Sequence, residues 1–365
     1  MFLSAAPTAG WRVAVALEDS VQMLRELPPT PSPRLSTAMH RPGLPLVALL
    51  LALGALAAVL ARPLRWEVDG LSMAPGLMPG DIVRSAAFPL LDALRPPRRF
   101  ERFVVQAPDG SIGIKRIAGL PGERLSIADG DLAIDGEIAL TPPGVLAEIA
   151  SPLSAREEQG DDVSIRIVID HPPLDDAPFA PGERRVLLPV RDIGLAAVVH
   201  AQRSGGCLRL AAGDDAVRFR PQGPGRFMLV AGRLDGRFVA GAWPIVESEP
   251  TLAAKRSGLA GQPPAAWQVA RPWADATPAE APLVLECRDE SGPATGVMSL
   301  EKVFAWRDIL HRPAADAVVE WRLGPGEFFV LGDFPSGSRD SRQWGPIAAD
   351  RILHRATSAT PLQAP

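Results

Sequence analysis

An uncharged apolar run near the N-terminus constrains this 365-residue chain more than any other feature. Residues 44–61, LPLVALLLALGALAAVLA, contain no Asp, Glu, Lys or Arg. As a helix that rises about 1.5 Å per residue, the run would be roughly 27 Å long, close to the hydrocarbon thickness of a bilayer. A helix that is apolar on every face needs a large protein around it to be buried in water, and only a polar tail precedes this one. The run therefore predicts a transmembrane helix over residues 42–62.

Two further interpretations of this region stay open. Arg41 precedes the run, and Val59 and Ala61 could stand before a cleavage point, so the run also fits a cleaved signal peptide. The long tail over residues 1–41 and the proline after the run count against cleavage. Met39 is a second candidate translation start, because the Pro- and Ser-rich stretch before it has no clear core. Nearby arginines favour an N-terminus inside the cell only slightly.

Composition excludes some classes of function. Apolar residues make up 47% of the chain, which is enough for real cores, while 39 prolines and 33 glycines favour short elements over long helical bundles. The formal net charge is −4, so no global basic field exists to hold nucleic acid, and we expect no nucleic-acid partner. Cys207 and Cys287 make no CxxC pair, and either a disulfide or two free thiols would fit. We expect no metal and no cofactor.

After Arg65, short β-type runs alternate with turn residues and predict a mainly β fold. RFVVQAP, IGIKRIAGL and RLSIADGDLAIDGEIAL are candidate strands, the last folded into a hairpin at Asp129-Gly130. Later candidate strands are VSIRIVID, RRVLLPV, VRFRP and the hairpin RFMLVAGRLDGRFVAGAW around Asp235-Gly236. We predict these parts: a tail over 1–41, a helix over 42–62, a core over 63–140, a β-rich insertion over 141–318, the rest of the core over 319–358, and a tail over 359–365.

A serine and a lysine form a candidate catalytic pair. Ser72 lies in the loop DGLSMAPGLMPGD, where Gly70 lets the backbone approach a substrate, although a serine in such a loop is usually a turn former. Lys115 lies in the apolar strand SIGIKRIAGL, and a lysine on a solvent-facing side is the plainer expectation there. If its amine is buried instead, desolvation lowers its pKa. A neutral lysine amine can take the proton from a serine hydroxyl without a histidine.

A third block, GDFPSGSRDSRQWGPI over residues 332–347, follows the predicted strand EFFVLGDF. It could be a charged surface loop. Alternatively, Ser338 could hold the lysine amine by a hydrogen bond, and Asp340 could pair with Arg116 or Arg342. The five histidines are scattered and none adjoins a candidate serine, so a Ser/His/Asp triad has no local support.

In this order, after one membrane anchor, the three blocks resemble those of bacterial type I signal peptidases, the leader peptidases. These are membrane-bound serine proteases that remove signal peptides from exported proteins. VDGLSMAPGLMPGD resembles the nucleophile box, IGIKRIAGLPGERLSI the lysine box, and GEFFVLGDFPSGSRDSRQWGPI the last box. The resemblance covers residues 44–139 and 327–356. The chain departs from the family at residues 334–337, Phe-Pro-Ser-Gly, where the family usually has Asn-Arg-Asp-Asn.

The resemblance implies a signal-peptidase-like antiparallel β core, anchored by one N-terminal transmembrane helix and carrying a large β-rich insertion. It implies that Ser72 is the nucleophile, Lys115 the general base and Ser338 the residue that orients the lysine. Gly70 stands where some members have a serine, so backbone N–H groups would stabilise the oxyanion. The expected site residues are catalytic Ser72 and Lys115, supporting Ser338, Gly70, Arg116, Asp340 and Arg342, and substrate-binding Met73, Pro75 and Ile114.

The implied activity is cleavage of N-terminal signal peptides from exported preproteins by a Ser/Lys dyad. It implies a single-pass protein of the cytoplasmic (inner) membrane with its catalytic domain on the extracytoplasmic side. The implied partners are signal-peptide-bearing preproteins, membrane lipid and the protein translocation machinery. Two alternatives stay open: a specialised conjugation-type Ser/Lys peptidase with a narrow substrate range, and an inactive membrane-anchored protein whose insertion binds a partner.

Overall fold

The structure is a computed structural model of the chain. It describes residues 43–60, 62–85, 94–128, 130–154, 156–159, 164–169, 173–175, 184, 186–246, 251–273, 283–290, 298–312 and 320–361. The predicted tail over 1–41, residue Asp129 and the side chain of Cys287 lie outside the described residues, and with them the possible disulfide.

The apolar run forms the helix α2, Gly43–Leu60. Within the described residues, no helix has the length and apolarity needed to cross a membrane. The transmembrane anchor therefore stays a prediction.

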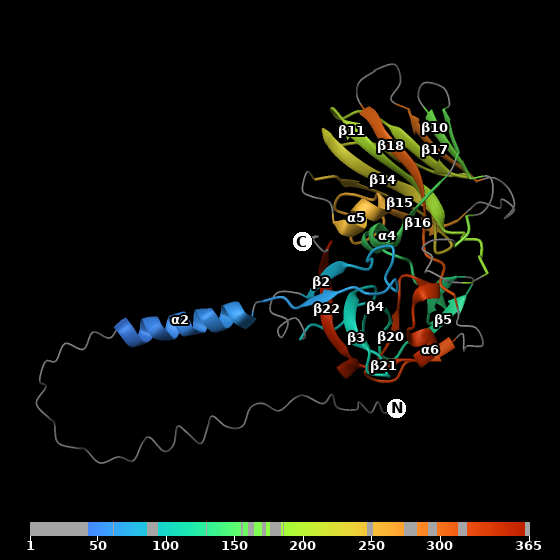
Figure 1. The fold of residues 1–365 in the computed structure, drawn as a ribbon. Coiled ribbons are helices and arrows are strands. Elements are labelled where there is room, and N and C mark those ends of the chain that lie inside the picture. Colours follow the sequence, from blue (N-terminus) through green and yellow to red (C-terminus); the bar gives the residue numbers. More distant parts are fainter. Residues whose placement is uncertain are drawn as a thin grey trace, which may run out of the picture. The chain divides into compact units, whose positions relative to one another are not determined.

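Two antiparallel sheets combine strands from the first and the last part of the chain (Figure 1). The four-stranded sheet has the order β19 (Glu320–Arg322), β5 (Arg124–Ala128), β6 (Asp131–Ile134) and β7 (Glu137–Ile138). The seven-stranded sheet has the order β1 (Arg65–Glu67), β2 (Asp81–Ser85), β22 (Ile352–Pro361), β3 (Arg102–Gln106), β4 (Ile112–Gly119), β20 (Glu327–Leu331) and β21 (Ile347–Ala348).

The region between them forms two further antiparallel sheets. The six-stranded sheet has the order β16 (Val269–Pro272), β15 (Arg237–Pro244), β14 (Gly225–Leu234), β11 (Ile193–Ala201), β18 (Met298–Arg307) and β8 (Ser151–Leu153). The five-stranded sheet has the order β13 (Asp215–Phe219), β12 (Leu208–Ala212), β17 (Leu283–Asp289), β10 (Ser164–Ile169) and β9 (Arg156–Gln159).

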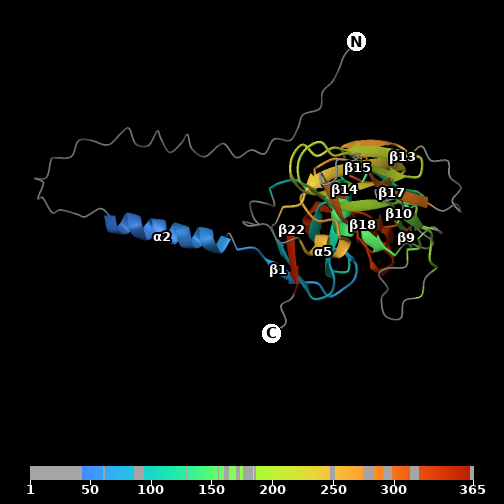
Figure 2. The same ribbon diagram turned by 90° about the horizontal axis from the view of Figure 1, so that it is seen from above.

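These two sheets face one another across a shared apolar core, and Figure 2 shows their strands in two layers. Leu195, Leu229 and Phe238 of the six-stranded sheet pack against Leu208 and Leu285 of the five-stranded one. The other face of the six-stranded sheet is covered by two short helices, α4 (Pro143–Ile149) and α5 (Leu252–Ser257). Both helices lie between the insertion's sheets and the seven-stranded sheet (Figure 1). The remaining short helices are η1 (Pro335–Gly337), α6 (Ser341–Trp344) and η2 (Ala349–Arg351).

Local turn chemistry predicts the hairpins correctly. Leu234 pairs with Arg237, and the two turn residues Asp235 and Gly236 both have positive φ, as the tightest hairpin turns require. The predicted hairpin between β5 and β6 also forms. The mainly β prediction is therefore confirmed.

Two strand predictions fail in the insertion. RRVLLPV forms no strand among its described residues, and only Pro189 makes an isolated bridge, to Leu174. The sequence reasoning also missed β11, whose residues 193–199 are all buried. A strand covered on both faces shows no alternation of apolar and polar residues, so the two-residue period that marks a half-buried strand is absent.

Candidate active site

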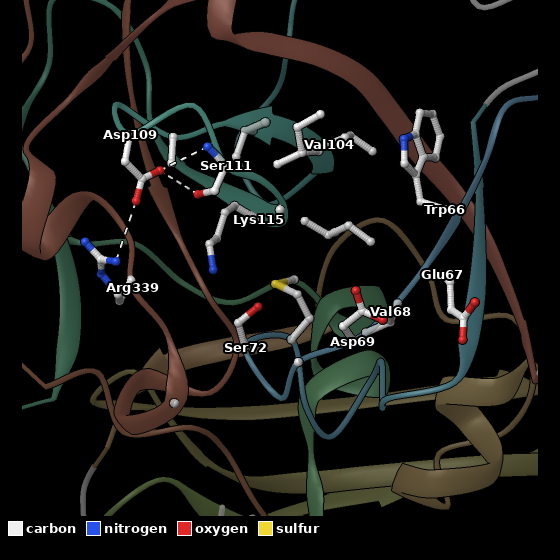
Figure 3. A pocket seen from close by; sticks show the side chains of 18 of the residues that line it. Trp66, Glu67, Val68, Asp69, Ser72, Val104, Asp109, Ser111, Lys115 and Arg339 are labelled. Atoms are coloured by element: carbon white, nitrogen blue, oxygen red, sulfur yellow. Dashed lines mark hydrogen bonds and ion pairs between the residues drawn. The ribbon is translucent and has the colours of Figure 1, made fainter.

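A cleft of about 380 Å³ lies beside β4 and the loop between β1 and β2. Ser72 from that loop and Lys115 from β4 both line it. Figure 3 shows the lysine amine and the serine hydroxyl pointing toward one another inside it. The fold therefore brings together two residues that are 43 positions apart in the sequence (115 − 72).

Lys115 is buried, with 5% of its surface exposed. Its strand β4 lies in the middle of the seven-stranded sheet, between β3 and β20, so the expectation of a solvent-facing lysine is wrong. The Lys115 amine donates a hydrogen bond of 2.9 Å to Ser338 Oγ. Burial lowers the pKa of this amine to about 8, while the Asp340 carboxylate acts in the opposite direction. About a tenth of the amine is therefore neutral at pH 7, far more than for an ordinary lysine, which allows it to act as a general base.

Ser72 is half-buried in a tight loop. Its carbonyl accepts a hydrogen bond of 3.0 Å from the N–H of Phe334. In the part of the chain that the structure describes, its backbone N–H donates to no acceptor, and its hydroxyl makes no hydrogen bond with Lys115. Catalytic hydrogen bonds often tighten only when substrate binds, so this arrangement leaves the hydroxyl and the N–H available to a substrate carbonyl.

The third block follows β20, and one of its residues contacts Lys115. Ser338 is 4% exposed and accepts the bond from Lys115. Asp340 is fully buried and pairs with Arg342 through two bonds of 2.8 Å. Asp340 also accepts from the N–H of Gly332 and caps α6. Burial alone would raise the pKa of Asp340, but the bonds from Arg342 hold it below its usual value, so the carboxylate stays charged.

The atypical turn over residues 334–337 has its own support. It forms η1, and its Pro335 carbonyl accepts a bond of 2.8 Å from Arg342. Gly332 just before it is in tight contact: a Cβ there would lie 2.5 Å from the carbonyl oxygen of Ser72 and closer still to Ser338 Oγ. The start of the third block is therefore packed tightly against the loop that carries Ser72.

Arg116 pairs with a residue to which the sequence reasoning gave no role. Its guanidinium makes two bonds, of 2.8 and 2.7 Å, to the carboxylate of Asp333, and a third, of 3.0 Å, to Glu148. Of the two predicted pairings for Asp340, the structure forms the one with Arg342. A buried arginine needs a carboxylate partner. The sequence signal for this partner was Asp333, in the Gly-Asp pair of the last box.

The predicted substrate contacts lie in different places. Met73, Ile114 and Gly70 line the cleft with Ser72. Pro75 does not line it, and instead lines a separate small cavity with Phe334 and other residues. The loop turns sharply between them, since the N–H of Leu77 bonds back to the carbonyl of Met73.

A separate group of carboxylates lies away from the cleft. Carboxylate oxygens of Asp131, Asp192 and Asp235 lie within 4.8 Å of one another. Among the described residues, these three aspartates form the group that could hold a metal ion. Burial, followed by the neighbouring Asp192 carboxylate, raises the pKa of Asp131 to about 8. Their burial favours protonated carboxyls in the absence of a cation.

A comparison with protein-family models gives a match to the signal peptidase, peptidase S26 family over residues 41–159. The match covers about a third of the chain and supports a relation of this segment to the signal peptidase family. The family implies a serine peptidase, and the matched segment contains both Ser72 and Lys115. No curated protein matches the chain.

The family match ends well before the last block of the chain. Ser338, Asp340 and Arg342 lie outside it, and they reach Lys115 through the pairing of β20 with β4. Most of the insertion also lies outside the match.

Proposed function

We propose that this protein is a membrane-bound signal peptidase I, which removes N-terminal signal peptides from exported preproteins with Ser72 and Lys115. The observation that carries the proposal is the buried amine of Lys115, which faces the Ser72 hydroxyl and is bonded to Ser338. Its pKa of about 8 supports a role as general base.

In the proposed reaction, Ser72 Oγ attacks the carbonyl carbon of the scissile bond while Lys115 takes the hydroxyl proton. The developing oxyanion accepts a hydrogen bond from the backbone N–H of Ser72. The C–N bond then breaks, and Lys115 returns its proton to the departing amine. Water, deprotonated in turn by Lys115, hydrolyses the acyl ester and releases the signal peptide with a carboxyl end.

The shape of the cleft suits an extended peptide. Its lining includes residues 67–70 on one side and the start of β4 on the other, and Val68, Met73 and Ile114 give it apolar surface. A substrate strand with small residues, such as alanine, at the first and third positions before the cut would fit this arrangement. Ser338 would keep the lysine directed at the nucleophile, and Asp340 with Arg342 would hold Ser338 in place.

Anchoring forms part of the same proposal. The predicted anchor over residues 42–62 would hold the chain in the cytoplasmic membrane, and the ten residues from Arg62 to Ser72 reach at most about 35 Å. The nucleophile would then work near the extracytoplasmic surface, where the translocation machinery delivers cleavage sites.

The test uses full-length protein in detergent with a preprotein that carries alanines before its cleavage site. We expect the wild type to cleave it, and both Ser72→Ala and Lys115→Ala to lose at least about a thousandfold in kcat. Lys302→Ala is the matched control, because Lys302 lies exposed on β18, and it should cleave like the wild type. Cleavage by Ser72→Ala at the wild-type rate would refute the dyad. A wild type that processes only a narrow set of substrates would favour a specialised peptidase.

A further inference from the structure

The helices α4 and α5 are fixed to the insertion. Leu146 of α4 and Leu259 just after α5 belong to one apolar core with Trp243 and Trp306 of the six-stranded sheet. The Ser257 hydroxyl donates a bond of 2.8 Å to the Ala147 carbonyl and so links the two helices. They therefore form one layer that is packed on the six-stranded sheet of the insertion.

From this layer, α5 reaches the loop that carries Ser72. Arg256 donates to both carboxylate oxygens of Asp81, at 2.6 and 3.0 Å, and to the carbonyl of Gly76 at 3.1 Å. Asp81 is 2% exposed, and its carboxylate also accepts from the N–H of Met78. Its carbonyl accepts from the N–H of Val68, so Asp81 closes the loop over residues 68–81. Arg256 therefore binds this loop at its closing point and at one position inside it.

The other helix, α4, contacts the same loop and the lysine strand. A Cβ on Gly76 would lie 2.7 Å from the carbonyl oxygen of Glu148, so the loop lies directly against the end of α4. The Glu148 carboxylate bonds Arg116 and Arg102, each at 3.0 Å. Arg116 is the neighbour of Lys115 on β4, and Arg102 lies opposite Arg116 on β3. The layer thus touches both the nucleophile loop and the strand of the base.

We infer that the insertion positions the catalytic pair: Arg256 and Glu148 hold the Ser72 loop and β4 in register with one another. The inference rests on the proposed function, and it makes both residues positioning residues that act through Asp81, Gly76 and Arg116. An arginine suits this task because its planar fork fixes the orientation of a carboxylate as well as its distance. Displacement of a nucleophile by about 1 Å costs up to roughly 100-fold in rate, so a loose loop would be costly.

Arg256→Ala in the full-length protein tests the inference. We expect kcat for preprotein cleavage to fall about 10- to 100-fold with KM changed by less than about twofold, because the Ser72 hydroxyl loses its alignment while the β4 side of the cleft keeps its place. Arg256→Lys keeps the charge and should recover part of kcat. The pH at which activity falls in acid should stay at the wild-type value, since that limb belongs to Lys115.

The insertion offers a matched control. Arg271 pairs with Asp215 at 2.6 Å, and Asp81 and Asp215 are both 2% exposed, yet the Arg271 pair lies wholly inside the insertion. Arg271→Ala should therefore weaken the insertion and leave kcat within about twofold of the wild type. Equal kcat values for Arg256→Ala and Arg271→Ala would overturn the inference.

A second measurement separates this inference from the proposed function. Amide hydrogen exchange over residues 70–81 should be faster in Arg256→Ala than in Arg271→Ala by about tenfold or more, whether or not a preprotein is cleaved. If the wild type cleaves no preprotein, the proposed function fails, and the exchange rates alone decide the inference. Unchanged exchange over these residues would refute it.

Discussion

At the scale of single residues, the burial of one amine sets the expected chemistry. Lys115 is buried beside Ser338, and its charged form has lost its hydration, so its pKa lies at about 8 rather than at the usual value for a lysine. The same residue on a solvent-facing strand would be protonated at neutral pH and could not accept a proton. Its position in the sheet therefore decides whether it can act as a base.

The pH dependence of cleavage checks this state directly. A base must be unprotonated, so kcat/KM should reach a plateau above about pH 8 and fall about tenfold per pH unit below it. The measurement is kcat/KM for a preprotein or peptide between pH 5.5 and about 9.5. A rate that stays flat from pH 8 down to about pH 6 would contradict a lysine base.

Gly332→Ala tests the contact between the nucleophile loop and the last block. The added methyl group would overlap Ser338 and the Ser72 carbonyl, both of which are held in place by hydrogen bonds. We expect kcat to fall about 100-fold and the free energy of unfolding by about 1–3 kcal/mol. Gly223→Ala is the control, since nothing lies within 4 Å of a Cβ there. Wild-type kcat in Gly332→Ala would show that this contact is not needed.

At the scale of elements, one buried ion pair joins β4 to the loop after β20. Arg116 and Asp333 are 217 positions apart, and both side chains are nearly buried where they pair. The carboxylates of Asp333 and Glu148 outweigh the effect of burial and raise the pKa of Arg116, so the guanidinium stays charged. Two strands that are distant in sequence are thus fixed by charge as well as by their backbone bonds.

Asp333→Ala should therefore be strongly destabilising. Removing one partner leaves a buried charge with incomplete compensation, at a cost of about 3–5 kcal/mol in the free energy of unfolding. Glu301→Ala is the control, because its pair with Arg226 is more exposed and should contribute about 0–1 kcal/mol. Urea unfolding of the full-length protein measures both. Similar losses of unfolding free energy in the two variants would mean that the Arg116 pair stabilises the fold no more than an exposed pair does.

At the scale of the whole molecule, aspartates meet where the insertion joins the core. Asp131 belongs to β6 of the core, whereas Asp192, Asp235 and Asp308 belong to the insertion. Burial, followed by the Asp192 carboxylate, raises the pKa of Asp235 to about 7, and burial also raises the pKa of Asp192 and of Asp308. The Arg233 guanidinium opposes the rise in the pKa of Asp192, but it lies 3.8 Å from that carboxylate. The junction therefore holds protons that the unfolded chain would release.

This junction should become less stable as pH rises. Groups whose pKa is raised in the folded state contribute stability at low pH and lose it as pH passes the folded pKa, here around pH 7–8. Asp192→Asn removes one carboxylate, so its stability relative to the wild type should increase between pH 5 and pH 8 and reach about 1 kcal/mol, or about 2–4 °C in Tm. Lys115 and His311 are present in both proteins. The difference in stability between Asp192→Asn and the wild type therefore isolates the effect of the aspartates.

Asp215→Asn serves as the control for this experiment. Asp215 is also buried but pairs with Arg271, so its replacement should destabilise the protein at both pH 5 and pH 8. A difference between Asp192→Asn and the wild type that does not change with pH would refute the account of the junction.

The sequence by itself determined the local features of this protein. Asp-Gly pairs predicted the hairpins, because the positive φ of a tight turn is a property of two neighbouring residues. Three short blocks predicted Ser72, Lys115 and Ser338 as the candidate site, because each block depends on its own residue types. The mainly β fold followed from short runs between turns.

The tertiary structure alone decided the burial of Lys115, the pairing of Arg116 with Asp333 and the contact of Arg256 with Asp81. The sequence indicates what each side chain can do, but which strands become neighbours determines whether that side chain is buried and which charge it meets. Burial and pairing act over distances in space that bear no relation to distance along the chain. For that reason the insertion, where sequence reasoning assigned no role, is connected to the candidate active site only in the folded molecule.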